Sequence, residues 1–445
     1  MKKIKCFILI IAVLIGCMTP VASLPNVEAA TVINIKYDDR YTFPSKIKTL
    51  YSTAIASYQL NSKKKDTAVL QIDPLNPKRV IATGCGKARV VLNNKKTYTV
   101  AVAPAHISLV LLVGQSNMEG ALTKDSAKKK AQKAMIRCKE GTVYNTYAPA
   151  TASSYENIGF YGLDGAERRS IDNVTKFIPS SLTDNSAAEV WKHTNNLTDG
   201  LGAVGKSGVD AGIGYQWYET SGEKIWMINC AKSGTSITQW QTDGKKCDNL
   251  FWQSVVLYQA AEKLLNQEIT ACHYVLSKKG IFWCQGEQDT YMSQENYEKY
   301  FHNMVANYET YLRGTNFKYL NHALDFIGIL MVRSYEEQVG YWYFPSGPRV
   351  AQYEMCKSTS VQNKKIILAS YLEEQWTSKA TITAYFYGKY GNNATYNALN
   401  PTYTKLKLPK KVSDIYYSPH FSQRARNEIG RDAALNVLNS FYTVQ

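Results

Sequence analysis

The sequence has few metal-binding residues and only one long apolar run, and both shortages narrow the class of protein. Its 445 residues include 6 His and 9 Cys, with no Cys-x-x-Cys pair and no Cys/His cluster at zinc spacing. A structural metal site is therefore not expected. Beyond the N-terminal segment, no apolar run approaches the roughly 20 residues that a membrane-spanning helix needs. The sequence therefore predicts no membrane span after its N-terminus.

The chain is basic, but its charge pattern is not that of a nucleic-acid-binding protein. The formal net charge is +16. The lysines stand in short scattered runs, as at 63–65, 128–130 and 410–411, which solvated loops and helix faces explain. With 45% hydrophobic and 20% charged residues, the composition is that of a globular protein with a sizeable core. We expect two domains and no nucleic-acid partner.

The N-terminus has the pattern of a secretory signal. Three lysines among the first five residues precede an apolar stretch, Cys6–Met18, that is too short to span a bilayer. Val27-Glu28-Ala29 then matches the small-x-small site of signal peptidase, so we expect residues 1–30 to be removed and the protein to be secreted. A second interpretation uses Leu14-Ile15-Gly16-Cys17 as a lipoprotein box, which would leave a lipidated Cys17 and a cell-surface protein.

Seven cysteines remain after residue 30, since two of the nine, Cys6 and Cys17, precede it. An odd count leaves at least one thiol unpaired. Cys230 and Cys284 lie in strand-like apolar runs, where we expect buried small hydrophobic side chains. A disulfide joining Cys247 to Cys230 or to Cys272 stays open.

Residues 31–104 have the pattern of a small β domain. Short β-rich runs separated by turn residues begin at Thr67, Arg79, Ala88 and Thr97, and Asn93-Asn94 fits a hairpin turn. The spacing predicts an antiparallel sandwich. The segment from Val80 to Val102 resembles bacterial group 2 immunoglobulin-like domains. The resemblance implies a spacer, or a contact to cell-wall or host glycan.

From residue 105 to 445, strand-like and helix-like segments alternate, which predicts an α/β fold of three layers around a mainly parallel sheet. The long segment 121–220 is rich in Asn, Ser, Gly and Tyr and is interpreted as loops with a few helices. The expected strands are continuous apolar runs at Ser108–Gly114, Lys224–Cys230, Gly280–Gln285 and Phe326–Val332. The expected helices are Trp252–Gln267, Gln294–Leu312 and Gln423–Phe441.

A glycine-flanked serine follows the first of these strands, in Gly114-Gln-Ser-Asn-Met-Glu-Gly120. The carboxyl end of a parallel strand is where open α/β sheets bind ligands. The two glycines permit a tight turn and a close substrate approach, which would expose Ser116 and its backbone N–H. The alternative is a serine that only caps a helix.

Three later segments supply the other parts of an acyl-transfer site. Gly234, in Cys230-Ala-Lys-Ser-Gly-Thr-Ser-Ile-Thr-Gln-Trp240, could present its N–H to an oxyanion. Gln285, in Phe282-Trp-Cys-Gln-Gly-Glu-Gln-Asp289, carries a neutral amide donor. His420, in Ser418-Pro-His-Phe, lies just ahead of the C-terminal helix and could act as a base.

The order of these four blocks resembles the SGNH hydrolases, and within them the sialate O-acetylesterase and acetylxylan esterase branch. The resemblance spans about residues 107–440. It implies that Ser116 is the nucleophile and His420 its base. It also implies an oxyanion hole made of the Ser116 N–H, the Gly234 N–H and the Gln285 side chain, with no metal or organic cofactor.

One position departs from the family pattern. The acid of the triad usually stands three residues before the histidine, where this chain has Tyr417. Asp414 and Glu287 are the candidate replacements, with Glu287 preferred. A Ser–His dyad held by a backbone carbonyl is the third option, because loss of the acid lowers the rate without abolishing catalysis.

The remaining candidates concern the substrate. Gln115 and Asn117 flank the nucleophile, Arg333 ends a strand and could bind a carboxylate, and Trp240 could stack on a sugar ring. The function predicted is removal of acetyl groups from an extracellular glycan, such as sialic acid or xylan. The alternatives are a glycan-binding surface protein with impaired catalysis, and an SGNH lipase or thioesterase.

Overall fold

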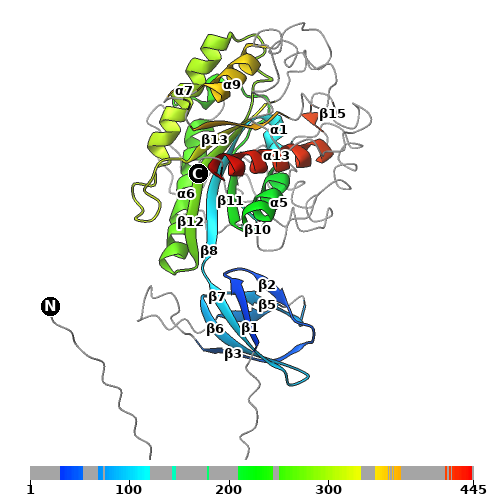
Figure 1. Cartoon of the computed structure of the whole chain (residues 1–445). Helices are drawn as coiled ribbons and strands as arrows, with labels where there is room; N and C mark the ends of the chain where they lie inside the picture. Colours follow the sequence, from blue (N-terminus) through cyan, green and yellow to red (C-terminus); the bar gives the residue numbers. More distant parts are fainter. Residues whose placement is uncertain are drawn as a thin grey trace, which may run out of the picture.

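The computed structural model describes residues 31–53, 69–73, 76–120, 143–146, 178–179, 209–243, 250–331, 346–358, 360, 363, 365–371, 416–417, 420–421 and 423–442. These residues form a small β unit followed by a larger α/β unit (Figure 1). Residues 1–30, with the expected signal peptide and Cys17, lie outside the described residues. So do most of the segment 121–220, Arg333 and Asp414. No described helix is long and apolar enough to cross a membrane.

The β unit consists of two small sheets that share one core. The strands of the first are, in order, β1 (Thr31–Lys36), β7 (Thr97–Ala103), β6 (Gly86–Leu92) and β3 (Ile47–Thr53); those of the second are β2 (Arg40–Thr42), β5 (Arg79–Ala82) and β4 (Leu70–Ile72). Alternate residues of β6 and β7, such as Val90 and Val100, point inward and are fully buried. The chain turns between these two strands at residues 93–96, where Asn93-Asn94 had indicated a hairpin.

The α/β unit is built on a seven-stranded sheet that is parallel except at one edge. In spatial order its strands are β10 (Ile178–Pro179), β9 (Val143–Thr146), β11 (Lys224–Asn229), β8 (Ala105–Gly114), β12 (Tyr274–Cys284), β13 (Phe326–Leu330) and β14 (Ile366–Ser370). Only β10, among the described strands of this sheet, runs antiparallel to its neighbour.

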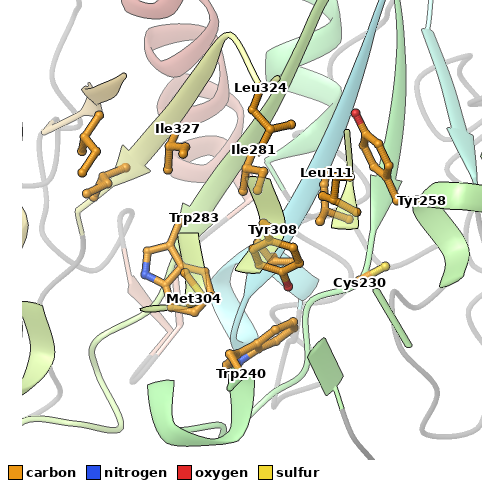
Figure 2. Close-up of a cluster of buried hydrophobic side chains, with 14 of the residues drawn as sticks. Leu111, Cys230, Trp240, Tyr258, Ile281, Trp283, Met304, Tyr308, Leu324 and Ile327 are labelled. Carbon is orange, nitrogen blue, oxygen red and sulfur yellow. The ribbon is translucent and has the colours of Figure 1, made fainter. Parts of the chain in front are cut away.

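Helices cover both faces of the sheet (Figure 1). One face carries α6 (Leu250–Thr270), α7 (Gln294–Tyr311) and α9 (Gly347–Lys357), and the other carries α5 (Asp210–Ser221) and α13 (Gln423–Tyr442). The central strand β8 is buried on both sides: Leu109, Leu111 and Val113 face the first core, and Val110 and Leu112 face the second. Figure 2 shows part of the first core, which contains Leu111 and Ile281. The three-layer α/β fold predicted from the sequence is confirmed.

Strand β12 begins at Tyr274, six residues before the expected start at Gly280. The added residues include polar ones, so the apolar pattern did not predict them as part of the strand. Lys279 is fully buried there, and its Nζ donates to Glu262 Oε1 at 2.6 Å and to the carbonyl oxygens of Leu312 (2.6 Å) and Leu320 (3.0 Å). A buried ammonium group is tolerated when its donors are paired in this way. Strand β14 also lies outside the expected set.

The described cysteines agree in part with what the sequence predicts. Cys230 and Cys284 are buried, as expected, and none of the five described cysteines, which also include Cys85, Cys272 and Cys356, forms a disulfide. Neither disulfide considered for Cys230 or Cys272 is therefore formed.

The two units meet at the amino-terminal ends of the strands. Tyr37 stacks on His273, with ring centroids 4.2 Å apart, and donates its hydroxyl hydrogen to Glu268 Oε2 at 3.2 Å. Lys224, the first residue of β11, pairs with Asp39 at 3.1 Å. Because these contacts lie at the opposite end of the strands from Ser116, the β unit leaves the carboxyl edge of the sheet uncovered.

Candidate active site

Three of the four sequence blocks come together because their strands are neighbours. Strand β8 lies between β11 and β12, with Leu112 opposite Asn229 and Gly114 opposite Cys284. Parallel strands end at the same edge of a sheet, so the loops that follow Gly114, Asn229 and Cys284 share one rim.

The turn into the nucleophile segment requires glycine at position 114. Its φ is +132°, and a Cβ there would lie 2.0 Å from the carbonyl oxygen of Cys284. The Gln115 N–H donates to that oxygen at 2.9 Å. Ser116 then opens the short helix α1 (Ser116–Glu119), which ends at Gly120 in the left-handed conformation. As the first helical residue, Ser116 has a backbone N–H with no acceptor inside the helix.

Asn117 links the nucleophile to two other blocks. Its Nδ2 donates to Glu287 Oε1 at 2.8 Å, and its Oδ1 accepts from the Phe421 N–H at 3.0 Å. The bond between Asn117 and Phe421 therefore joins the neighbour of Ser116 to the neighbour of His420. Asn117 is 1% exposed and both ends of its amide are engaged within the protein. This arrangement makes Asn117 a tether, rather than the substrate contact expected from the sequence.

The end of α1 holds the loop after β11. The carbonyl oxygen of Met118 accepts from Asn229 Nδ2 at 3.3 Å. The buried carboxylate of Glu119 accepts hydrogen bonds from the N–H and the hydroxyl of Ser233, at 2.8 Å for the N–H. Glu119 therefore fixes the residue immediately before Gly234.

Gly234 has the features of a backbone oxyanion donor. It is exposed, and its φ of +70° lies in the region that favours glycine. The Lys232 N–H donates to the carbonyl oxygen of Gly114 at 3.0 Å, so the loop is also attached to the strand that carries the nucleophile. Among the described residues, no acceptor is hydrogen-bonded to the Gly234 N–H. This N–H and that of Ser116 are both available to a carbonyl oxygen.

His420 lies in a short hairpin directly before α13. Strand β16 (His420–Phe421) pairs antiparallel with β15 (Tyr416–Tyr417), so that the backbone of Tyr417 is opposite His420. The imidazole is 8% exposed, and its Nδ1 is buried with no hydrogen-bond partner among the described residues. No hydrogen bond joins Ser116 to His420 among the described contacts; catalytic hydrogen bonds often form only in the substrate complex.

The described contacts give His420 no carboxylate partner at Nδ1. The hydrogen bond of Glu287 described here is to Asn117, and Asp414 and the side chain of Tyr417 lie outside the described residues. The charges that act on His420 are instead those of Arg426 and Glu119. Neither was singled out from the sequence, although Glu119 is part of the serine block and Arg426 is six residues beyond the histidine.

The electrostatic surroundings keep His420 neutral. Burial is the main cause that lowers its pKa, from 6.5 to about 4; the positive charge of Arg426 lowers it further, and the negative charge of Glu119 opposes both. Arg426 is itself completely buried in α13. A neutral imidazole at ordinary pH is the form that can accept a proton.

This shift predicts the pH dependence of activity. We expect kcat/KM for an acetate ester to fall only as the pH drops through about 4, because His420 must be neutral to act as a base. Arg426→Met should move this acid limb to higher pH, since a charge that opposes protonation is lost. Arg431→Met, a half-exposed arginine on the same helix, should leave it in place.

The measurement is kcat/KM from pH 3.5 to 8, with the folded fraction followed at each pH. The unfolded chain protonates His420 first, so the same shift destabilises the fold progressively from pH 6.5 down toward 4. An acid limb of the wild type near 6.5 would contradict the buried environment described above.

Gln285 does not offer its side chain to the site in this structure, contrary to the role expected from the sequence. Its Nε2 donates to the Thr235 carbonyl oxygen at 3.0 Å and to Asp289 Oδ2 at 2.6 Å, which uses both of its hydrogens. Its Oε1 accepts from the Tyr297 hydroxyl at 2.9 Å. Asp289 also accepts from the Ile237 N–H at 2.7 Å. Gln285 and Asp289 therefore hold the loop that follows β12 against the loop that follows β11.

Trp240 is a core residue, and the proposed stacking on a sugar ring is wrong for it. It is fully buried in the cluster of Figure 2, its ring lies edge-on to Trp283 at 5.8 Å, and its Nε1 donates to Thr235 Oγ1 at 3.1 Å. A sequence pattern does not distinguish an exposed tryptophan beside a strand from a buried one. Among the described residues, no group of His, Cys, Asp and Glu could hold a metal ion.

One segment of the chain matches a known protein family. Residues 173–336 match the family described as carbohydrate esterase, sialic acid-specific acetylesterase. The matched segment includes the Gly234 and Gln285 blocks, and Ser116 and His420 lie on either side of it. No curated protein matches the chain.

Three solved structures resemble the chain at low identity. A protein from Arabidopsis thaliana is 15% identical over 75% of this chain and 98% of its own, with a TM-score of 0.39. A carbohydrate acetylesterase from Xanthomonas citri is 15% identical over 67% and 58%, with a TM-score of 0.30. The structure titled NanS is 13% identical over 77% and 99%, with a TM-score of 0.40.

Proposed function

We propose that this protein is a secreted carbohydrate O-acetylesterase that acts through an acyl-enzyme on Ser116. The observation that carries the proposal is the meeting of the Ser116, Gly234 and His420 blocks, joined by the hydrogen bonds of Asn117 and Glu119. The carbohydrate-esterase match over residues 173–336 supports a sugar ester as the substrate class.

In the proposed reaction, the Ser116 hydroxyl oxygen attacks the carbonyl carbon of the acetyl group while His420 takes the hydroxyl proton. The N–H groups of Ser116 and Gly234 donate to the oxygen that becomes negative. Collapse of the tetrahedral intermediate releases the sugar alkoxide, which takes the proton from His420. Water then attacks the acetyl-enzyme with His420 again as base, and acetate leaves. No step requires a cofactor.

For the base, we propose a Ser–His dyad that works without a triad carboxylate at Nδ1. The negative charge of Glu119 favours the protonated form of His420 that is produced when Ser116 attacks, but burial and the positive charge of Arg426 outweigh it and keep the resting imidazole neutral. Asp414 stays an alternative. The buried Nδ1 without a described partner also supports the second candidate, a glycan-binding protein with impaired catalysis.

The test is acetate release from acetylated xylan, O-acetylated sialic acids and O-acetylated peptidoglycan, together with a series of chromogenic esters of increasing acyl length. The proposal expects turnover of a glycan and a steep loss of rate beyond the acetyl and propionyl esters. A preference for long acyl chains would indicate a lipase. Glycan binding without any acetate release would indicate the impaired protein.

Secretion and the role of the β unit are part of the same proposal. The signal pattern of residues 1–30 supports export, and the position of the β unit at the far end of the sheet supports a spacer that leaves the site open. N-terminal sequencing of the exported protein tests this. A new terminus near Ala30 is expected, and a lipidated Cys17 would show the alternative.

A further inference from the structure

The proposed acetylesterase site has two free backbone donors, the N–H groups of Ser116 and Gly234. The side-chain donor expected from the sequence, the amide of Gln285, is not available to it. The two hydrogens of the Gln285 amide are used by Thr235 and Asp289, and the side chain is completely buried. To reach a substrate, this amide would have to break both bonds and leave a carboxylate oxygen of Asp289 with one partner fewer. A donor that must first be freed is a poor oxyanion donor, because these donors act by being already in place.

A second glutamine, Gln115, directly precedes the nucleophile, and the nitrogen of its side-chain amide is free. The backbone of Gln115 is fully used: its N–H donates to Cys284, and its carbonyl oxygen accepts from the N–H groups of Met118 and Glu119, each at 2.9 Å. Its Oε1 accepts from the Gln288 N–H at 3.3 Å. Its Nε2 has no acceptor among the described residues, and it does not belong to the fully buried atoms that lack a partner. The side chain is 5% exposed, so this nitrogen keeps access to the solvent at the edge of the sheet and can be reached by a substrate.

The orientation of this amide follows from its one partner. Only an oxygen can accept from the Gln288 N–H, so exchanging the two ends of the amide would place two donors face to face. The Gln288 backbone therefore fixes Oε1 and leaves Nε2 as the free end. Gln288 belongs to the same loop as Gln285. This loop therefore orients the Gln115 side chain through the backbone N–H of Gln288.

We propose that the Gln115 side-chain amide, and not that of Gln285, is the third donor to the carbonyl oxygen of the ester. The inference rests on the proposed function. It assigns Gln115 the catalytic contact and Gln285 a positioning role. A neutral amide suits this position, because it stabilises a negative oxygen in a buried site without attracting the carboxylate product.

The experiment compares two variants of Gln115 with one of Gln285. Gln115→Met removes the donor at similar size and without charge. Gln115→Glu keeps an oxygen that can accept from the Gln288 N–H and removes the donor. Gln285→Met removes the amide that the sequence favoured. Two rates are measured: kcat/KM for a chromogenic acetate, and the rate of covalent labelling of Ser116 by a fluorophosphonate, which also develops negative charge on an oxygen in the hole. Thermal unfolding of each variant is recorded.

Both Gln115 variants should lose about 10²- to 10³-fold in kcat, the usual effect of removing one oxyanion donor, with a parallel loss of labelling rate and a nearly unchanged unfolding temperature. Gln285→Met should lower the unfolding temperature markedly and reduce the labelling rate of the folded protein less than Gln115→Met does. The proposal is overturned if both Gln115 variants stay within threefold of the wild type, or if folded Gln285→Met loses the larger factor.

The two rates separate this inference from the proposed function. If the wild type hydrolyses no acetate ester but is labelled at Ser116, the esterase proposal fails while the labelling rates still test Gln115. If the wild type hydrolyses acetate and the Gln115 variants do so equally well, the esterase proposal stands and the role of Gln115 is wrong.

Discussion

Ser116→Ala should lower kcat for a chromogenic acetate by about 10⁵- to 10⁶-fold, the size of effect seen when the nucleophile of a serine hydrolase is removed. Without the hydroxyl no acyl-enzyme forms, and only the oxyanion donors and substrate binding continue to favour hydrolysis. The fold should be unaffected. Ser116 makes no side-chain hydrogen bond to another described residue, and alanine is well tolerated at the start of a helix.

The rate is measured with purified protein at pH 7, where His420 is neutral, and thermal unfolding is recorded in parallel. Ser440→Ala is the matched control: this serine bonds to the Val437 carbonyl oxygen within α13, away from the sheet edge, and its loss should change kcat less than twofold. Retention of more than 1% of the activity by Ser116→Ala, at unchanged stability, would show that another nucleophile does the chemistry.

Gly114→Ala should destabilise the protein by more than about 4 kcal/mol and abolish activity in any fraction that folds. A Cβ at this position would overlap the Cys284 carbonyl oxygen at 2.0 Å, and the φ of +132° is unfavourable for alanine. Strands β8 and β12 would have to separate at the edge from which the Ser116 turn and the Gln285 loop both leave. The clash is with backbone, so no side chain can move to relieve it.

Gly222→Ala separates the dihedral effect from the overlap. Gly222 follows α5 with φ +67°, and a Cβ there meets no atom within 4 Å. Its substitution should cost only about 1–2 kcal/mol, the price of a left-handed residue that is not glycine. Urea unfolding gives both values. Equal losses in the two variants would mean that the packing of Gly114 against Cys284 does not set the geometry of the site.

These predictions share one feature of the site, which is that α1 is its centre. Asn117 holds the Glu287 loop and the strand after His420, and Glu119 holds the residue before Gly234. The nucleophile, the base and the oxyanion loop thus come from three parts of the chain and are brought to one helix of four residues. The same helix brings Glu119 close enough to act on the charge of His420.

The sequence by itself determined the layers and the edge of the sheet at which the site lies. Continuous apolar runs predicted the buried parallel strands, and parallel strands must end together, so the Ser116, Gly234 and Gln285 segments could be expected at one rim. The glycine at position 114 was also readable, because a tight turn before the nucleophile needs one. The sequence predicted strand β12 only from Gly280 onward. Lys279 is charged, and its burial in the strand could not be expected until the structure showed Glu262 paired with it.

The tertiary structure alone decided which side chains are free to act. Gln115 and Gln285 carry the same amide, and the sequence does not show which of them is free. Asp289 and Thr235 use the two donors of Gln285 and Tyr297 uses its acceptor, and of these three partners Thr235 and Tyr297 come from other segments. Trp240 was ambiguous in the same way, and only the structure shows that it is buried in the core against Trp283. Burial and hydrogen bonding depend on residues distant in the chain, and the chemistry available at a site depends on which polar groups those residues leave unpaired.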